Sequence, residues 1–390
     1  MNEMSQPRPR KIPTLQSLSA SQQAAIRAIP AHDAAQKVTC GATRPTGDFT
    51  TPERFLAEKA KIFRHFPVAV APSGQLPEPN SVLAHNGYGV PLLLTRDKGG
   101  VVRAFLNVCR HKGSLLVESC ETAKMGRVSC PYHAWTFGLN GDLVGVPRQE
   151  LFEGLDKSTH GLVRLPAREA GGIIWVKLDK TADDDFSHVT DELVSDLDAL
   201  GFPSAYVYGK RTFPIQANWK LVLEPFLEGY HVQRLHAQSI GQLFADVPSV
   251  HSRLGLHMRQ ISGKAQFEPT MLDVPGENIH KTVTHAYLLF PNTVIVTSPY
   301  YISLMIVMPV SERESVVDYY MLTQSAPDNP KAEELYSKSY QIIQGVFGNE
   351  DFRAAAISQT GLESGAIDEL TYCGLEIAIP EFYKSLESLL

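Results

Sequence analysis

The sequence of 390 residues has few cysteines, no long apolar run and no excess of basic residues. Five cysteines do not make a disulfide framework in a chain of this length, so we expect reduced thiols and a cytoplasmic protein. No stretch approaches the roughly 20 apolar residues of a transmembrane helix, and the N-terminal region lacks the apolar core of a secretory signal. The net charge of −6 and the absence of a basic stripe argue against nucleic acid or an acidic membrane surface as the partner.

Two of the five cysteines lie in short segments that each also contain a histidine. Cys109 precedes His111 by two positions, and after eighteen further residues Cys130 precedes His133 by three positions. Two thiolates and two imidazoles could bind one tetrahedral zinc ion, but finger-type zinc sites pair Cys with Cys and His with His, whereas both pairs here are mixed. A Rieske [2Fe-2S] centre places two Cys on one iron and two His on the other, which one Cys and one His from each loop satisfy.

The residues that flank these four side chains resemble the cluster loops of the Rieske non-heme iron oxygenases, whose usual forms are C-x-H-R-G and C-P-Y-H-G-W. Lys112 and Ala134 depart from the common Arg and Gly, beside the ligands rather than on them. The remaining cysteines have no assigned role: Cys40, Cys120 and Cys373. The resemblance implies a Rieske [2Fe-2S] cluster bound by four side chains: Cys109, His111, Cys130 and His133.

Short strand-like runs separated by Gly-containing turns surround the two loops and predict a small antiparallel β-domain. Asn140-Gly141 between apolar residues is a hairpin signal, and a run that contains Trp175 is expected to close the domain. An acidic run at 183–185 is typical of a solvated linker and marks a boundary near residue 180. We therefore predict an N-terminal arm, an antiparallel β-sandwich Rieske domain and a catalytic domain, at residues 1–48, 49–180 and 181–390 respectively.

A second candidate metal site lies in the predicted catalytic domain. His231 and His236 are five residues apart, and Glu228 lies three residues before His231. Two His and one carboxylate suit an Fe(II) site that leaves one face open for dioxygen and substrate. Five residues of a regular helix separate two side chains by about 140°, so a π-bulge or a helix end must bring the imidazoles together. A His pair at this spacing also occurs among ordinary surface or core histidines.

This segment, with Asn218-Trp219-Lys220 before it, resembles the N-W-K and carboxylate-x2-H-x4-H segments of the same oxygenases. The family usually has Asp where this chain has Glu228, and Asn near the position of Pro225. The resemblance implies that His231 and His236 bind mononuclear Fe(II).

The third iron ligand is expected to be a carboxylate near the C-terminus. Asp351 precedes Gln359 by eight positions, which resembles the family helix in which an Asp precedes Q-x-G. Glu350 is the fallback ligand. From the residues alone, either acid could be an ordinary charge at a helix N-terminus.

Four apolar runs and two helical stretches predict the body of the catalytic domain. The runs at 287–290, 293–296, 301–307 and 315–322 are expected to form buried strands of a curved antiparallel sheet, with helices at 331–347 and 349–364. The predicted fold class is therefore α+β, with a Rieske β-sandwich followed by a sheet flanked by helices.

The resemblance implies a terminal oxygenase that hydroxylates a small organic substrate with O2. A partner ferredoxin or flavin reductase would supply the electrons from NAD(P)H, because the chain has no dinucleotide-binding fingerprint. An aromatic substrate and a role in aromatic hydrocarbon catabolism are expected, and monooxygenation or demethylation of a non-aromatic or N-/O-methyl substrate is the alternative. Rivals of other classes are a Rieske electron carrier without oxygenase activity and a zinc hydrolase that uses His231, His236 and Asp351.

The resemblance also implies an assembly. In the family, the two metal sites of one chain are too far apart for electron transfer, and a ring brings the cluster of one subunit beside the iron of the next. We expect a homotrimer, with or without a small beta subunit. Glu228 is expected to bridge the two centres, with one oxygen on His231 and the other on His133 of the partner subunit.

Overall fold

Two compact units make up the part of the chain that the computed structural model describes, residues 12–390. Residues 63–189 form the small unit, and residues 12–62 together with 190–390 form the large unit. The described part of the predicted N-terminal arm therefore belongs to the large unit. No helix within the described residues combines the length and the apolar composition that crossing a membrane requires.

The small unit consists of short antiparallel strands, as its turn-rich sequence predicts. The strands are β2 (Val68–Pro72), β3 (Ser81–His85), β4 (Leu92–Arg96), β5 (Val102–Leu106), β6 (Ala123–Lys124), β7 (Arg127–Ser129), β8 (Thr136–Gly138), β9 (Leu143–Gly145), β10 (Arg164–Leu165), β11 (Ala167–Ala170) and β12 (Ile173–Val176). They form three sheets with the orders β10-β5-β4-β3-β6, β11-β12-β2 and β7-β8-β9. Asn140-Gly141 turns the chain between β8 and β9, as predicted.

Both cysteine loops rest on one apolar core of the small unit. Cys109 and Cys130 are buried and pack together with Val128, Phe137 and Leu143. The first loop follows β5, and the second connects β7 to β8. The core therefore fixes the bases of the two loops that carry the Cys and His side chains.

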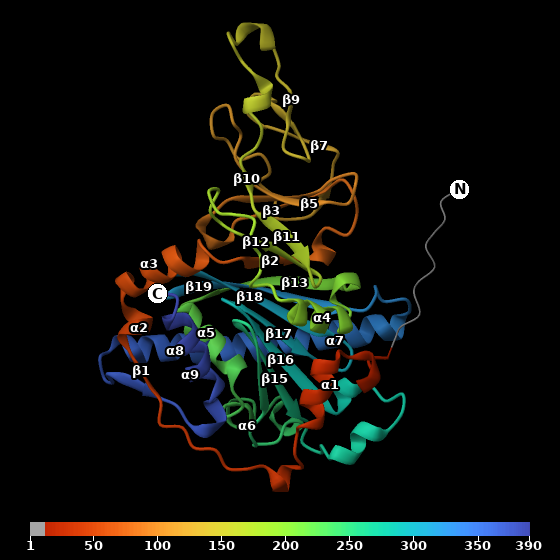
Figure 1. Ribbon diagram of the computed structural model, residues 1–390, viewed down its shortest axis with the longest axis vertical. Helices are drawn as coiled ribbons and strands as arrows, with labels where there is room; N and C mark the ends of the chain where they lie inside the picture. Colours follow the sequence, from red (N-terminus) through yellow and green to blue (C-terminus); the bar gives the residue numbers. More distant parts are fainter. Residues whose placement is uncertain (1–11) are drawn as a thin grey trace. The chain divides into compact units, whose positions relative to one another are not determined.

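A seven-stranded antiparallel sheet is the centre of the large unit (Figure 1). Its strands are β13 (Tyr206–Ile215), β14 (Val250–Leu254), β15 (His257–Gly263), β16 (Val283–Leu289), β17 (Thr293–Thr297), β18 (Ile302–Ser311) and β19 (Glu314–Thr323), and a separate pair joins β1 (Thr43–Pro45) to β20 (Glu369–Thr371). The order in the sheet is β13-β19-β18-β17-β16-β15-β14. The four predicted strands coincide with β16 to β19, whose residues are nearly all buried.

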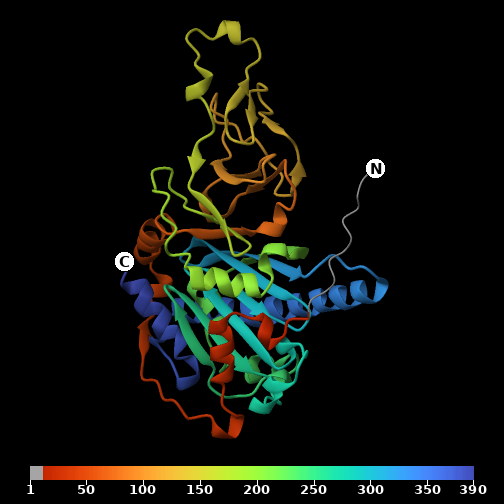
Figure 2. The ribbon, with the colours of Figure 1, turned by 45° about the vertical axis from the view of Figure 1, so that its right-hand side comes forward.

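Helices pack on both faces of this sheet. They are α1 (Ala20–Arg27), α2 (Gly47–Thr50), α3 (Pro52–Glu58), α4 (Asp191–Ala199), α5 (Trp219–Leu223), α6 (Val232–Leu235), α7 (Pro330–Val346), α8 (Phe352–Glu363) and α9 (Ala378–Glu387). Phe213 of β13 contacts Phe352 of α8, with 5.3 Å between the ring centroids. On the opposite face, Arg259 of β15 forms a buried ion pair with Asp196 of α4. Figure 2 shows α1 and α4 in front of the strands and α7 behind them. The mixed helix and sheet composition confirms the predicted α+β class.

The N-terminal stretch contributes to the core beside α1, because Leu18 and Ile26 pack against Ile261 and Val283 of the sheet. This stretch therefore packs on the sheet of the same chain.

A buried ion pair anchors the Asn-Trp-Lys segment to α3. Lys220 and Glu58 are both fully buried, and Lys220 Nζ donates to the two carboxylate oxygens at 2.7 and 2.8 Å. Trp219 Nε1 donates to the same carboxylate at 2.8 Å, and Asn218 caps α5 by accepting from the backbone N–H of Lys220. Because an unpaired buried charge is costly, these contacts hold α5 firmly where the chain enters the second metal segment.

Candidate active site

The two cysteine loops of the small unit have the same backbone hydrogen bonds. Cys109 N–H donates to Ser114 O at 2.8 Å, and Cys130 N–H donates to Trp135 O at 2.8 Å. In each loop, the residue four positions after the cysteine donates back to the cysteine carbonyl at 3.0 Å. That residue is Gly113 in the first loop and Ala134 in the second, and both have positive φ, +76° and +56°.

Ala134 therefore adopts the left-handed conformation that Gly adopts without steric cost. Its methyl group imposes a penalty of about 1 kcal/mol on the second loop, relative to the Gly that is usual in the resembled family. Ala134 in place of the usual Gly thus adds strain to the second loop, while this loop keeps the same hydrogen bonds as the first.

The donor atoms of the loops fit a two-iron cluster better than one zinc ion. The imidazoles of His111 and His133 lie 4.7 Å apart between centroids, and the Nδ1 atom of each is buried without a hydrogen-bond partner. Within residues 12–390, no three of these four Cys and His donors lie within 4.8 Å of one another, as one tetrahedral ion would require. His111 stacks on Trp135 at 4.9 Å, which fixes the plane of its ring. Two orphaned Nδ1 atoms and two buried thiols match the donor types that a Rieske centre requires.

The two histidines of the large unit flank the short helix α6. His231 is the residue before the helix and His236 the residue after it, so the helix ends where the second imidazole is needed. Glu228 has an extended backbone and does not belong to that helix. Its Oε2 accepts the His231 N–H at 3.1 Å, and its Oε1 lies 2.5 Å from His231 Nδ1.

The acidic side of the site is a π-helical turn at Phe347–Asp351, between α7 and α8. The sequence predicted two helices there but no such turn. Asp351 ends it and is 2 % exposed. Glu350, the fallback ligand, does not lie among the converging donors: its Oε2 is 2.5 Å from His236 Nδ1, the nitrogen that faces away from Asp351.

Three side chains converge in the large unit. Asp351 Oδ1 lies 3.5 Å from His231 Nε2 and 3.3 Å from His236 Nε2, and it has no hydrogen-bond partner. Two ligands about 2.1 Å from one ion, at an angle of about 90–110°, are separated by roughly 3.0–3.4 Å. Within residues 12–390, these three side chains are the one set of His, Cys, Asp or Glu whose donor atoms all lie within 4.8 Å of one another. The set has the composition of a facial triad for Fe(II).

The acids around His236 control its protonation. Burial lowers the pKa of His236, but the carboxylates of Asp351 and Glu350 outweigh this effect, and the pKa is raised overall. The two carboxylates that raise this pKa would also attract a divalent cation.

Two family models match the chain, one on each unit. The model described as Rieske [2Fe-2S] domain matches residues 66–156, and the model described as ring hydroxylating alpha subunit (catalytic domain) matches residues 202–390. The chain is a Rieske oxygenase alpha subunit. The oxygenase thus uses a Rieske cluster, a mononuclear iron, dioxygen, a small substrate and electrons from a partner. A catalytic domain over residues 202–390 excludes the electron carrier without oxygenase activity and the zinc hydrolase.

Relatives and solved structures agree with this assignment. The chloroplastic choline monooxygenase of Amaranthus tricolor is 28% identical over 346 residues, which cover 87% of this chain and 74% of that protein. The quaternary ammonium Rieske monooxygenase CntA in complex with L-carnitine has a TM-score of 0.76 at 22% identity, covering 89% of this chain and 96% of that one. Naphthalene 1,2-dioxygenase from Rhodococcus sp. has a TM-score of 0.74 at 20% identity, covering 89% and 94%. The two structures show the shared fold.

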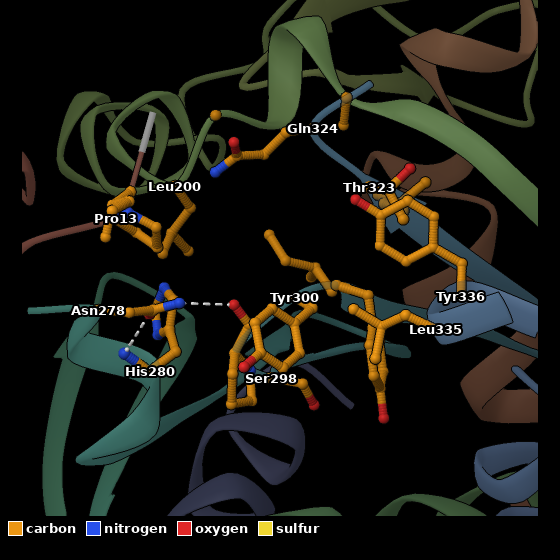
Figure 3. A pocket seen from close by; sticks show the side chains of 17 residues that line it. Pro13, Leu200, Asn278, His280, Ser298, Tyr300, Thr323, Gln324, Leu335 and Tyr336 are labelled. Atoms are coloured by element: carbon orange, nitrogen blue, oxygen red, sulfur yellow. Dashed lines mark hydrogen bonds between the residues drawn. The ribbon is translucent and has the colours of Figure 1, made fainter. Parts of the chain in front are cut away.

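A cavity of about 290 Å³ lies in the large unit, where β17 leads into β18 (Figure 3). Tyr300, Tyr301 and Tyr336 line it, and Asn278 donates to Pro299 O at 2.7 Å in its wall. Within the described residues, no Asp, Glu, Lys or Arg lines this cavity. None of the three converging metal donors lines it either, so it is not the space beside them.

Glu224, four residues before Glu228, is a partly buried acid whose ionisation opposes folding. Tyr372 and Tyr383 donate to its Oε1 at 3.0 and 2.6 Å, yet burial dominates and raises its pKa from 4.5 to about 7. Between these two pH values, the unfolded chain loses the proton and the folded chain keeps it. The contribution of Glu224 to stability therefore falls as the pH rises through this window and stays low above it.

Glu224→Gln should remove this dependence, since the amide cannot ionise and its oxygen still accepts from the tyrosines. We expect the variant to match the wild type near pH 5 and to be more stable near pH 8, by at most about 3 kcal/mol because part of the residue is exposed. Thermal midpoints of both proteins at the two pH values measure the effect. An equal difference at both pH values would show that Glu224 is ionised in the folded protein throughout.

Proposed function

We propose that this oxygenase hydroxylates a small N-methylated ammonium compound, at an iron held by His231, His236 and Asp351. The observation that carries the iron assignment is the convergence of two Nε2 atoms on an Oδ1 that has no hydrogen-bond partner. The likeness to choline monooxygenase supports the substrate class. The proposal prefers the N-methyl substrate, which was the alternative in the sequence analysis, to the expected aromatic substrate. The aromatic substrate remains an untested prediction.

The cluster, in this proposal, is held by the four loop side chains, with the thiols on one iron and the orphaned Nδ1 atoms on the other. An external ferredoxin or flavin reductase supplies the electrons and uses NAD(P)H. The oxygenase assembles as a homotrimer, with or without a small beta subunit.

His231, His236 and Asp351 would hold the iron with three donors, which would leave further coordination positions for dioxygen and substrate. When bound, the iron supplies the reduction of dioxygen that inserts one oxygen atom into a C–H bond of the substrate. The balance is one dioxygen, two electrons and two protons consumed, with one hydroxylated product and one water formed. The residues contribute position: each imidazole presents Nε2, because a glutamate accepts a hydrogen bond from its Nδ1.

His231 is the most accessible of the three proposed ligands. Its side chain is 19% exposed, whereas those of His236 and Asp351 are 4% and 2% exposed. We propose that dioxygen and substrate approach from the side of His231.

The test is oxygenation by the reconstituted enzyme with a reductase, labelled dioxygen and a panel of substrates. We expect labelled product from one of choline, carnitine and glycine betaine, and none from benzoate or naphthalene. The uncharged analogue of choline, dimethylbutanol, is the matched control and should not be oxidised. Labelled product from the aromatic compounds alone would contradict the proposed substrate class and restore the aromatic one.

A further inference from the structure

Glu350 and Asp351 are consecutive residues, and their carboxylates lie on opposite nitrogens of one imidazole. Glu350 Oε2 is 2.5 Å from His236 Nδ1, and Asp351 Oδ1 is 3.3 Å from His236 Nε2. The π-helical turn Phe347–Asp351 presents both acids to the same ring. The side chain of His236 is only 4% exposed, so water does not compete freely for either nitrogen.

The two contacts differ in what they require of the ring. A neutral imidazole carries one N–H and one lone pair, and an ionised carboxylate can only accept a hydrogen bond. The short contact with Glu350 therefore places the proton on Nδ1. The lone pair is then on Nε2, which faces Asp351 and the proposed iron.

A second residue keeps Glu350 in place. Ser239 Oγ donates to the same Oε2 of Glu350 at 2.7 Å. The backbone of His236 is fixed as well, because its carbonyl accepts the N–H groups of Ser239 and Gly241, each at 2.9 Å. A Cβ added to Gly241 would lie 2.8 Å from that carbonyl oxygen, so the close approach requires glycine.

We propose that Glu350 is a positioning residue that holds His236 in the tautomer and orientation that present Nε2 to the iron. The inference rests on the proposed function, in which His236 is an iron ligand. In this proposal Glu350 does not bind the iron, although the sequence analysis named it as the alternative ligand to Asp351. It binds His236 instead. Each proposed histidine ligand then has its own glutamate, Glu228 for His231 and Glu350 for His236.

The experiment measures Fe(II) affinity of the cluster-containing protein by anaerobic competition with a coloured chelator. Glu350→Ala should bind Fe(II) about 10–100-fold more weakly than the wild type. Glu350→Gln should recover most of this loss, because its amide oxygen still accepts from Nδ1. Ser239→Ala should have a smaller effect than Glu350→Ala. The matched control is Glu334→Gln, an exposed acid of α7 that pairs with Lys338, and its affinity should be unchanged.

Thermal midpoints and cluster absorbance of all variants accompany the affinities, since a merely structural role would lower the midpoint and leave the affinity of the folded protein unaltered. An affinity of Glu350→Ala within about twofold of the wild type would overturn the proposal. A loss as complete as that of Asp351→Ala, without recovery in Glu350→Gln, would make Glu350 a ligand and overturn it too. Failure of the wild type itself to bind a mononuclear iron would instead contradict the proposed function.

Discussion

Asp351→Ala is expected to lose all turnover while the visible absorbance of the Rieske cluster stays unchanged. Asp351 Oδ1 faces both Nε2 atoms, at 3.5 and 3.3 Å, so its loss leaves two imidazoles to hold the iron. Iron content should fall from about three to about two atoms per chain, the number in the cluster alone. Product formation, iron analysis and the visible spectrum measure the three quantities on the same sample.

The control for this variant is Asp273→Ala, because Asp273 is an exposed acid of the large unit whose ion pair with Arg27 at 3.4 Å contributes little to stability. It should retain iron, cluster and activity. Folding of Asp351→Ala is not expected to fail, since Oδ1 makes no hydrogen bond. Normal iron content and turnover in Asp351→Ala would remove Asp351 from the ligand set and leave Glu350 as the candidate.

Local spacing together with the family resemblance predicted the three side chains that converge in the large unit, His231, His236 and Asp351. The pattern of Cys109 and His111 with Cys130 and His133 belongs to two loops whose geometry is made by hydrogen bonds within each loop. The prediction of Asp351 relied on its separation of eight positions from Gln359 in the sequence. In the structure, Gln359 Oε1 accepts the N–H of Asn218 at 2.9 Å, and this hydrogen bond connects α8 to the start of α5. The roles of these residues as ligands stay predictions.

Contacts between distant segments could not be predicted from the sequence. The π-helical turn at Phe347–Asp351 gives no periodicity signal in five residues. The sequence therefore predicts Glu350 as an alternative ligand to Asp351, whereas in the structure it contacts His236. In the sequence, the only indication of this contact was that Glu350 is the acidic neighbour of Asp351. The sequence did not predict β13, β14 and β15. Most residues of β13 and β14 are half-buried or exposed in no regular alternation. β15 is buried but contains the polar residues His257, Arg259 and Gln260, so it gives no apolar run.

The predicted domain limits at residues 48 and 180 also stay predictions. They relied on composition, whereas packing assigns chain to units: α1 lies on the large sheet although it comes before the small unit in the sequence. Composition cannot show that the segments before and after the small unit belong to the same large unit.

Glu228→Gln is expected to lose most product formation while keeping both metal centres. The sequence assigned one oxygen of Glu228 to His231 and the other to His133 of the partner subunit. In the structure both oxygens contact His231, Oε1 at Nδ1 and Oε2 at the backbone N–H. A carboxylate oxygen can accept two hydrogen bonds, so Oε2 retains a lone pair for the bridge. We propose that this lone pair completes the path from the cluster of one subunit to the iron of the next.

Single turnover separates the bridge from the simpler role of orienting His231. The variant, with its cluster reduced beforehand and substrate bound, is mixed with dioxygen, and reoxidation of the cluster is followed by absorbance. For a bridge, we expect normal iron content and reoxidation slowed by about 10–100-fold. If Glu228 only orients His231, the amide oxygen of the Gln still accepts from Nδ1, so iron binding and the reoxidation rate should both stay close to those of the wild type. Glu228→Asp keeps the negative charge and introduces the residue that is usual in the family. This variant should be more active than Glu228→Gln. A purified monomer with full activity would refute the bridge, because the path requires a second subunit.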